Sequence, residues 1–410
     1  IIALIGAPLI TVLAAAGLLA SHSAEISPDI LIIEMNRLAS SPNMIAIPLF
    51  TFAGVLMSSG GSPRRLVEFY RAAFGWMPGG LAIVTIGACA FFTTFSGASG
   101  VTILALGGLL YPILMGEGYK EKFSLGLLTT SGSLGLLFPP SLAILIYGIV
   151  AGVNIQDMFI AGIAPGLLLM AMLAFYSMYH GGKSCVIKHK FNASTLLTTT
   201  RGAIWDLFLP IGIIIGIFGG FVSIMEAAAV TAAYVLFIEA VVFKEINLRT
   251  QFFGLLVESC VLFGSLLAIL LVELGVTNLM IDAQLPMKLL AVIEEYIDSP
   301  LEFLLILNLF LLLIGAMMDI FSAIIVVVPL ILPIATRYGI DPIHLGVIFL
   351  ANLEIGYSTP PVGINLFIAS QRFGRPILSL FRAAIPFLVL MIFWLAMVTY
   401  IPFISLWWQP

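Results

Sequence analysis

The chain has 410 residues, of which 61% are hydrophobic and only 9% are charged, and its formal net charge is −4. Soluble domains carry about 25% charged residues, so this composition excludes a soluble globular protein and indicates an all-helical, polytopic membrane protein. No Walker A string is present, which excludes ATP hydrolysis by that route. The three cysteines and four histidines are scattered and indicate neither a disulfide framework nor a metal site.

Apolar runs of about 17–25 residues between polar breaks predict the membrane-spanning segments. In chain order these are 1–20, 42–59, 79–115, 121–152, 158–180, 205–222, 224–243, 253–281, 302–336, 343–371 and 379–407. Four of them, 79–115, 121–152, 302–336 and 343–371, are too long for one straight crossing, and each has a polar or Gly/Pro break near its middle. Each of the four is therefore either a re-entrant hairpin or a crossing helix that is broken halfway.

The positions of the basic residues predict the orientation. If 79–115 and 302–336 are hairpins and 121–152 and 343–371 are broken crossings, every Lys and Arg except Arg37, Lys288 and Arg337 falls on one side. The positive-inside rule makes that side cytoplasmic. Two full crossings in place of either hairpin would leave the sidedness unchanged, so the hairpins need separate support.

An internal repeat supplies that support. YPILMGEGYKEKFSLGLLTTSGSLGLLFPPS (111–141) aligns with LPIATRYGIDPIHLGVIFLANLEIGYSTPPV (332–362). In each segment a glycine stands four residues before a proline pair, as Gly135 does before Pro139-Pro140 and Gly356 before Pro360-Pro361. Each half of the chain therefore predicts a hairpin followed by a broken helix, and the two units enter the membrane from opposite sides. Inverted repeats with discontinuous helices are typical of secondary transporters.

The breaks and hairpin tips predict where ions bind. A proline pair inside a span removes two backbone donors and frees carbonyl groups one turn earlier. Such oxygens bind hard cations such as Na+, whereas the N-termini of half-helices favour an anionic substrate. We expect one tip to face one break at each of two ion sites. The oxygen donors expected from the residues are those of Ser96, Gly97 and Ser99 at the first tip, and of Gly135, Ser141, Gly356, Ser358 and Thr359 at the breaks.

Polar side chains near the second break have more than one interpretation. A carboxylate at the bilayer centre costs about 2.5–3.5 kcal/mol, so we favour an ion-linked role for Asp319 over a charge that simply reaches water. Glu354 either takes part in ion or proton coupling or pairs with a group facing the cavity. Asn352 and Asn365 flank the break, where they either line the substrate cavity or form interhelical hydrogen bonds.

The string around Ser99 and two amphipathic segments are two further features of the sequence. Ser99 lies in a Gly-Ala-Ser-Gly string similar to that of rhomboid proteases, but a serine nucleophile needs a nearby base. His180 and His344 fall far from it in the predicted topology, so we expect no enzymatic activity. Segments 22–38 and 282–301 are amphipathic and predict helices along the outer interface, either bracing a scaffold or lying there passively.

The chain resembles the large membrane subunit (DctM type) of tripartite ATP-independent periplasmic (TRAP) transporters. The similarity extends from about residue 6 to the end. It is carried by NMIAIPLFTFAGVLMSSGG, FSGASG, FPPSLAILIYGIVAGVNI, GIFGGFVSIMEAAAVTAAY, LPIATRYGIDPIHLG, NLEIGYSTPPVGINLFIAS and VTYIPFISLW.

This resemblance implies a Na+-driven secondary transporter of the bacterial inner membrane, in which a mobile domain moves like an elevator against a scaffold. It implies an organic acid substrate, a periplasmic binding protein that delivers it, a small membrane subunit, and no nucleic-acid partner. A stand-alone Na+/organic-anion symporter without a binding protein is the alternative. The expected division is scaffold helices and an interfacial arm (1–78), first hairpin and broken helix (79–157), scaffold helices and a second arm (158–301), second hairpin and broken helix (302–378), and a C-terminal helix (379–410).

The resemblance also implies the site residues. The expected Na+ ligands are Ser96, Gly97 and Ser99 facing Gly135, and Gly315 and Asp319 facing Gly356 and Thr359. The expected substrate residues are Pro139, Pro140, Ser141, Ser322, Asn352, Pro360, Pro361 and Asn365. The chain departs from the family pattern at Thr102, where an acidic residue is frequent, at Asp319-Ile320, where Asp-Pro is common, and at Glu354, where an apolar residue is usual. These departures bear on ion stoichiometry and on a contribution from protons.

Overall fold

The computed structural model describes residues 9–23, 32–33, 36, 42–77, 79–97, 99–183, 191–297 and 299–409. This part of the chain is helical and contains no strand. Within it, seven helices are long and apolar enough to cross a membrane, or up to eight if each bent pair counts as one span. The predicted all-helical, multi-pass class is therefore confirmed. Most of the predicted arm 22–38 lies outside the described residues.

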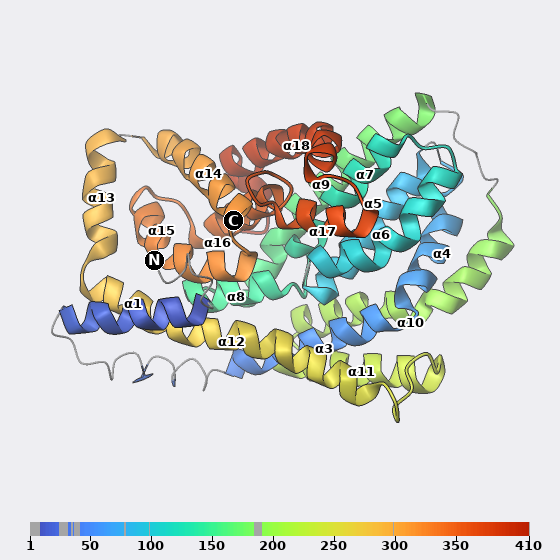
Figure 1. The fold of residues 1–410 in the computed structure, drawn as a ribbon, viewed down its shortest axis with the longest axis horizontal. Helices are drawn as coiled ribbons and strands as arrows, with labels where there is room; N and C mark the ends of the chain where they lie inside the picture. Colours follow the sequence, from blue (N-terminus) through green and yellow to red (C-terminus); the bar gives the residue numbers. More distant parts are fainter. Residues whose placement is uncertain are drawn as a thin grey trace.

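The first repeat forms a hairpin, a broken helix and one further helix (Figure 1). The hairpin turns at Gly97, whose φ of +64° is accessible chiefly to glycine. The broken span bends by 47° between its two halves. The elements are α5 (Gly80–Ser96), α6 (Ser99–Gly116), α7 (Glu121–Ser131), the short 3-10 helix η3 (Leu134–Leu137), α8 (Leu142–Ala151) and α9 (Ile155–Lys183).

The second repeat has the same order of elements. Its hairpin turns at Asp319, and its broken helix is interrupted over residues 357–363. The elements are α14 (Pro300–Met317), α15 (Ile320–Arg337), α16 (Pro342–Gly356), α17 (Ile364–Phe373), α18 (Ile377–Tyr400) and η5 (Pro402–Ile404). The predicted hairpins and breaks are thus present in both halves of the chain.

The two repeats interlock through equivalent contacts. The second helix of each hairpin packs against the second half of the other repeat's broken helix, α6 on α17 and α15 on α8. The first half of each broken helix packs against the last helix of the other repeat, α7 on α18 and α16 on α9. By these contacts α9 and α18 are equivalent helices.

Most of α9 falls in the range 158–301, which was expected to be scaffold, yet α9 packs against α5, α8 and α16. The predicted domain boundaries stay predictions.

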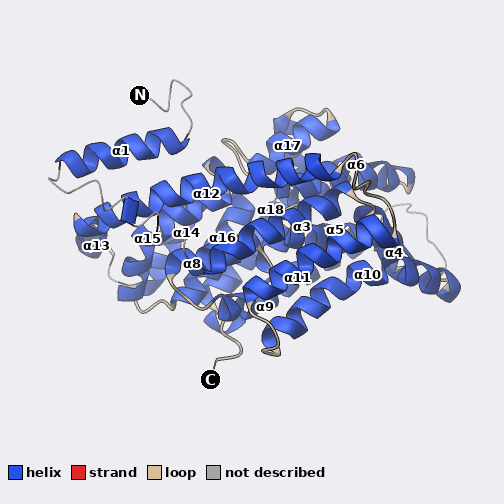
Figure 2. Ribbon diagram, turned by 90° about the horizontal axis from the view of Figure 1, so that it is seen from below, coloured by secondary structure: helices blue, strands red, loops and turns tan. Residues whose placement is uncertain are grey.

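The remaining helices form a third group, of which α1, α12, α3 and α11 lie along the lower edge of Figure 1. α3 packs against α11, α12 and α5, and α1 lies along α12 in both ribbon views (Figures 1 and 2). The sequence did not predict α4, which packs against α10 and α5. The elements are α1 (Leu9–Ser23), η2 (Pro42–Ile45), α3 (Ala46–Ser59), α4 (Ser62–Phe74), α10 (Ala193–Phe218), α11 (Ile224–Phe237), the π-turn η4 (Ile238–Val242), α12 (Phe252–Asp282) and α13 (Leu285–Tyr296).

A buried ionic network joins three elements of this group. Arg65 of α4 donates from Nε to Asp206 Oδ2 of α10 at 2.8 Å and from Nη2 to Glu239 Oε1 at 2.5 Å. Its Nη1 also pairs with Glu245, and Ser62 donates to Glu239 Oε1 at 2.7 Å. Burial alone would lower the pKa of the guanidinium, but the hydrogen bonds and charges of Asp206 and Glu239 raise it above its ordinary value. Arg65 therefore stays charged at every accessible pH.

Candidate functional site

The first hairpin tip lies directly against the first break. Gly135 approaches α5 so closely that a Cβ atom there would collide with the Ala90 carbonyl and the Thr94 amide, and would lie 2.7 Å from Thr93 Cβ. Thr94 donates its hydroxyl hydrogen bond to the Ala90 carbonyl of its own helix at 2.8 Å, and its Oγ1 lies 3.3 Å from the Gly135 carbonyl oxygen. The first hairpin therefore touches its break through Ala90, Thr93 and Thr94, which precede the predicted tip residues Ser96, Gly97 and Ser99, and a glycine is required at this contact.

A chain of hydroxyl groups connects the tip to the backbone of the break. Thr93 donates to the carbonyl of Gly132 at 2.7 Å, and its Oγ1 lies 2.7 Å from Thr102 Oγ1. Because Thr93 uses its single proton on Gly132, Thr102 is the donor to Thr93. Ser96 Oγ lies 3.5 Å from Thr102 Oγ1. Thr102 thus supplies a neutral oxygen to this cluster.

Removing the Thr93 hydroxyl tests this arrangement. Thr93→Val is expected to lower the free energy of unfolding by about 1–3 kcal/mol, because the buried Gly132 carbonyl loses its side-chain donor. Thr85→Val is the matched control, since Thr85 is also buried in α5 but donates only to Leu81 of its own helix, at 2.9 Å. The measurement is thermal unfolding of purified protein in nanodiscs. Equal stability losses for the two variants would contradict the assigned role of Thr93.

The second hairpin contacts the second break in the equivalent way. A Cβ atom at Gly356 would collide with the backbone of Gly315 and lie 2.6 Å from its Cα. Beyond the contact, the amides of Val362 and Gly363 donate to the Ala316 carbonyl at 3.2 and 3.1 Å. Thr359 donates its hydroxyl to the Gly356 carbonyl at 2.9 Å. Of the second predicted set, Gly315 and Gly356 are therefore in direct contact, and Thr359 bonds to Gly356.

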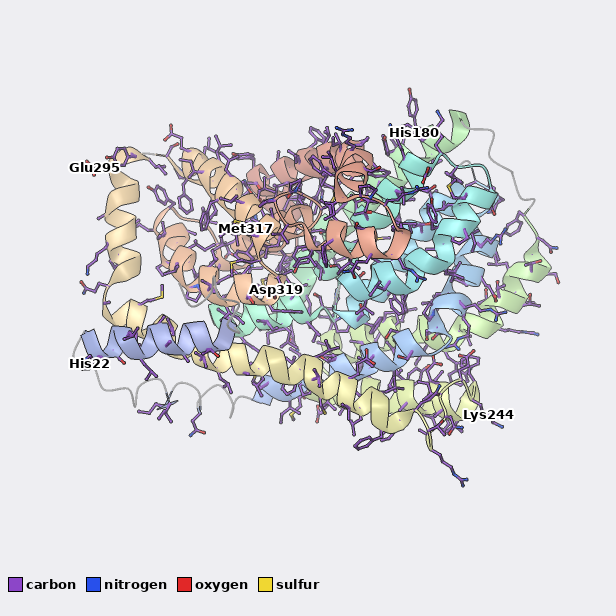
Figure 3. The ribbon with its side chains drawn as sticks, in the orientation of Figure 1. His22, His180, Lys244, Glu295, Met317 and Asp319 are labelled. Carbon is purple, nitrogen blue, oxygen red and sulfur yellow. The ribbon has the colours of Figure 1, made fainter. Side chains whose placement is uncertain are left out.

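Asp319 and Tyr357 define the turn of the second hairpin. Figure 3 labels Asp319 at this turn, where its Oδ1 accepts hydrogen bonds from the amides of Phe321 and Ser322 at 3.0 and 3.1 Å. The carboxylate therefore caps α15. Tyr357, which the sequence analysis did not single out, accepts a hydrogen bond from the Ile320 amide through its hydroxyl oxygen. The ion-linked role of Asp319 stays a prediction beside this structural one.

The two breaks also touch each other. Ser133, between α7 and η3, places its Oγ 3.4 Å from the Thr130 carbonyl oxygen and 3.5 Å from the Glu354 carbonyl oxygen. Asn365, at the start of α17, donates from its side-chain amide to the Thr129 carbonyl at 3.3 Å. Both donors are buried. We call this region, from Thr129 to Ser133 and from Glu354 to Asn365, the crossing.

Buried oxygen atoms without hydrogen-bond partners are concentrated at the breaks. Buried polar atoms in proteins are nearly always hydrogen-bonded, so unsatisfied ones indicate an ion, a ligand or a water. Among the described residues, the unpartnered side-chain oxygens at or near the breaks are those of Ser131, Ser141, Asn352, Glu354, Ser358 and Asn365. No group of three or more His, Cys, Asp and Glu side chains that could hold a metal occurs in the described part. Any cation here would be bound mainly by neutral oxygens.

The half-helices that follow the breaks begin without side-chain caps. Ser141 precedes α8 and Gly363 precedes α17, and neither makes a capping hydrogen bond from its side chain. By contrast, Asn192, Ser223, Ser299, Asp319 and Asp341 cap their helices. At α8 the first amide groups and the positive end of the helix dipole are of the kind that binds an anionic group, whereas at α17 the Asn365 amide already donates to the Tyr357 carbonyl at 2.9 Å.

The predicted substrate residues differ in exposure. Pro139 and Pro140 are buried, and Pro139 lines a largely apolar cavity of about 310 Å³ with Thr94, Phe138 and Pro210. Pro360 and Pro361 are exposed. Ser322 is buried in the first turn of α15.

Asn352 forms an interhelical hydrogen bond. It donates to Asn308 Oδ1 at 2.6 Å, and an interhelical hydrogen bond is one of the two interpretations left open by the sequence.

Four residues at the site, Thr93, Thr129, Ser133 and Tyr357, were not among the predicted site residues. Their one sequence signal is a hydroxyl group inside an otherwise apolar run.

Comparison with known proteins identifies relatives over nearly the whole chain. The family model described as the tripartite ATP-independent periplasmic transporter, DctM component, matches residues 1–404. The C4-dicarboxylate TRAP transporter large permease protein DctM of Pseudomonas aeruginosa is 36% identical over 385 residues, covering 93% of this chain and 90% of that protein. The isethionate TRAP transporter permease protein DctMQ of Oleidesulfovibrio alaskensis is 35% identical over 404 residues, covering 98% of this chain and 62% of that protein.

A solved structure shares the fold. The crystal structure of the YdaH transporter of Alcanivorax borkumensis superposes with a TM-score of 0.61 at 15% sequence identity, covering 92% of this chain and 88% of that one. At this identity the likeness concerns the fold alone.

Two interlocked repeats, each with a hairpin packed against a broken helix, define the architecture of a secondary membrane transporter. The chain belongs to the DctM family, the large membrane component of TRAP transporters. Its relatives are named as transporter permeases, which points to transport rather than catalysis. His344 is hydrogen-bonded to Ser405 and to the Thr399 carbonyl, at 2.6 and 3.3 Å.

Proposed function

We propose that this chain imports an organic acid anion across the bacterial inner membrane, with the energy supplied by a Na+ gradient. The observation that carries the proposal is the pair of hairpin–break contacts, each with unwound backbone and hydroxyl oxygens inside a membrane domain. Unwound carbonyl groups at such breaks coordinate Na+ in secondary transporters. The oxygens of the first tip and the Gly135 break would hold one ion, and those around Gly315, Gly356 and Thr359 a second.

The proposed substrate is a small organic acid. The relatives' names give C4-dicarboxylate, isethionate, ectoine and sialic acid as the solutes of those proteins. The N-terminus of α8, which has no side-chain cap, and the helix dipole of α17 support an anionic group between the two breaks. Ser141, Asn365 and the proline pairs lie beside these N-termini and are the proposed substrate contacts.

Movement of the two repeats against the other helices is the proposed elevator step. The apolar cavity between Pro210 and Ile214 of α10 and the first repeat supports it, because an apolar boundary with spare volume resists sliding less than a polar, fully packed one. A small membrane subunit would extend the scaffold, and a periplasmic binding protein would deliver the solute. The relative named DctMQ spans a longer chain than this one.

Reconstituted uptake tests the proposed function. A thermal-shift screen of the binding protein first identifies which of succinate, isethionate, ectoine and sialic acid it binds. The radiolabelled form of that solute is then used to measure uptake into proteoliposomes that contain the large and small subunits, with the binding protein added outside. Uptake is expected to require Na+ outside and to stop when K+ replaces it. Equal uptake with and without a Na+ gradient would overturn the coupling, and uptake without the binding protein would favour the stand-alone symporter.

A further inference from the structure

An apolar cavity of about 310 Å³ lies between the first break and α10. Its walls include Phe91 of α5, Pro139 of the break, Leu167 of α9 and Ile214 of α10. An apolar cavity of about 150 Å³ is enough to hold benzene in another protein. A hydrocarbon group as large as a phenyl ring therefore fits into this cavity.

The cavity adjoins the N-terminus of α8. Phe138 and Pro139 line it, and the amide of Ser141 donates to the Phe138 carbonyl at 2.9 Å, which closes a four-residue turn. The two ends of such a turn lie within about 7 Å of each other. Ser141 directly precedes α8, and its buried hydroxyl has no hydrogen-bond partner among the described residues. An anionic group bound at the start of α8 therefore has the cavity beside it, within reach of its own carbon chain.

The walls of the cavity carry no charge. The two polar side chains among the described residues that line it, Tyr70 and Thr94, are neutral, and Thr94 donates to Ala90 of its own helix at 2.8 Å. A hydrocarbon group gains free energy by leaving water for such a cavity. A second carboxylate would instead lose its hydration without finding a cation, which is strongly unfavourable. The cavity therefore favours an organic acid with one anionic end and an apolar body over a dianion.

The cavity is shared between the first repeat and a helix outside the repeats. The ring of Phe138 packs against α9 at Gly166, where a Cβ atom would lie 2.7 Å from Phe138 Cζ. Pro210 and Ile214 belong to α10, which lies in the third group of helices. A solute in the cavity therefore contacts both the repeat that carries the first break and the group against which the repeats are proposed to move.

We propose that this cavity is the specificity pocket for the hydrocarbon part of the transported anion. The solute is then a monoanionic organic acid whose body is a phenyl or branched alkyl group. The proposal rests on the proposed function, because the anionic end of the solute is placed at the first break. Phe138 and Ile214 determine specificity, since their side chains set the size of the group that fits.

Equilibrium dialysis of radiolabelled anions against the complex of large and small subunits in nanodiscs tests the pocket. The probes are 3-phenylpropionate, propionate and succinate in NaCl, and binding to empty nanodiscs is subtracted. The wild type is expected to bind 3-phenylpropionate at least about tenfold more tightly than propionate, because even one methylene group in an apolar pocket changes discrimination by about 10–200-fold. Succinate is expected to bind more weakly than 3-phenylpropionate, since its second carboxylate finds no cation in the cavity.

Variants that fill the cavity locate the binding. Ile214→Trp should weaken 3-phenylpropionate binding by about tenfold or more and leave propionate binding unchanged, by the same pocket-filling argument. Leu167→Trp fills the cavity from α9 and serves as the second variant should the first unfold. Ile211→Trp is the matched control, because Ile211 is also an exposed side chain of α10 but does not line the cavity. It should bind all three anions as the wild type does.

The outcomes separate the pocket from the proposed function. Succinate binding as tight as that of 3-phenylpropionate, or unchanged 3-phenylpropionate binding in both cavity variants, would overturn the pocket and leave the proposed function intact. A phospholipid that copurifies with the wild type in native mass spectrometry and is lost from Ile214→Trp would also overturn the pocket, since the cavity then holds an acyl chain. Failure of the wild type to bind any of the three anions would overturn the proposed anion site and the pocket with it.

Discussion

Replacement of Arg65 by methionine is expected to lower the free energy of unfolding by about 3–5 kcal/mol, because removing one partner from a buried ion pair strands the other charge. Asp206 and Glu239 are only 4% and 0% exposed, and Arg65 is the cation that both of them contact. These three side chains join α4, α10 and the π-turn after α11. Thermal unfolding in nanodiscs, followed by a calibrated denaturant titration, measures the loss.

The neighbouring arginine provides the control. Arg64 pairs with Glu68 at 3.0 Å, but the two side chains are 79% and 53% exposed, and such surface pairs contribute about 0–1 kcal/mol. Arg64→Met should therefore have little effect. Addition of Asp206→Asn and Glu239→Gln to Arg65→Met should recover part of the stability, since the stranded charges are then removed. Similar losses of stability for Arg64→Met and Arg65→Met would show that the network does not stabilise this group of helices.

Gly356→Ala is expected to abolish transport and to destabilise the protein by about 1–3 kcal/mol or more, the cost of overpacking a filled interior. The added methyl group would collide with the Gly315 backbone, which has no freedom to move aside as a flexible side chain would. Gly135→Ala should have the same effect in the first repeat, where the obstacle is the backbone of Ala90 and Thr94. Uptake and thermal unfolding are measured on the same preparations.

An alanine substitution at an open helical position separates the effect of the backbone collision from the effect of adding a methyl group to a helix. A Cβ atom at Gly202 of α10 would meet no atom within 4 Å, and Gly→Ala inside a helix stabilises by about 0.5–1 kcal/mol. Gly202→Ala should therefore preserve uptake and raise the melting temperature slightly. Wild-type transport by both Gly135→Ala and Gly356→Ala would contradict the requirement for close contact between hairpin and break.

The sequence predicted the features that depend on local backbone chemistry. Glycines and proline pairs inside apolar runs indicate interruptions wherever they occur, so both hairpins and both broken helices were recognisable. The repeat was recognisable because Gly135 and Gly356 occupy the same register before Pro-Pro. The structure gives the physical reason, since each of these glycines lies where a side chain would collide with the first helix of its own hairpin.

Features that depend on contacts between distant segments could not be predicted in this way. The partners of Arg65 lie more than 140 positions away in the chain, and an isolated carboxylate such as Asp206 does not indicate which cation it contacts. The packing of α9 against α5, α8 and α16 likewise depends on how the repeats interlock. Thr93 and Thr102 meet only after the hairpin closes at Gly97.

The interlocking of the repeats suggests why two ion sites would act together. Each broken helix is held on one side by its own hairpin and on the other by elements of the opposite repeat. The hydrogen bond from Asn365 to Thr129 then joins the breaks directly, and Ser133 Oγ lies 3.5 Å from the Glu354 carbonyl oxygen. A cation bound at either break would therefore stabilise a junction that both repeats share.

The Na+ dependence of solute uptake in paired variants tests the central claim most directly. Ser99→Ala removes a tip hydroxyl in the first proposed site, and Thr359→Val removes the hydroxyl that donates to Gly356 in the second. If Na+ binds at both hairpin–break contacts, each variant will need a higher Na+ concentration than the wild type for half-maximal uptake in proteoliposomes. Identical Na+ dependence in the wild type and both variants would contradict the assignment of the ion sites.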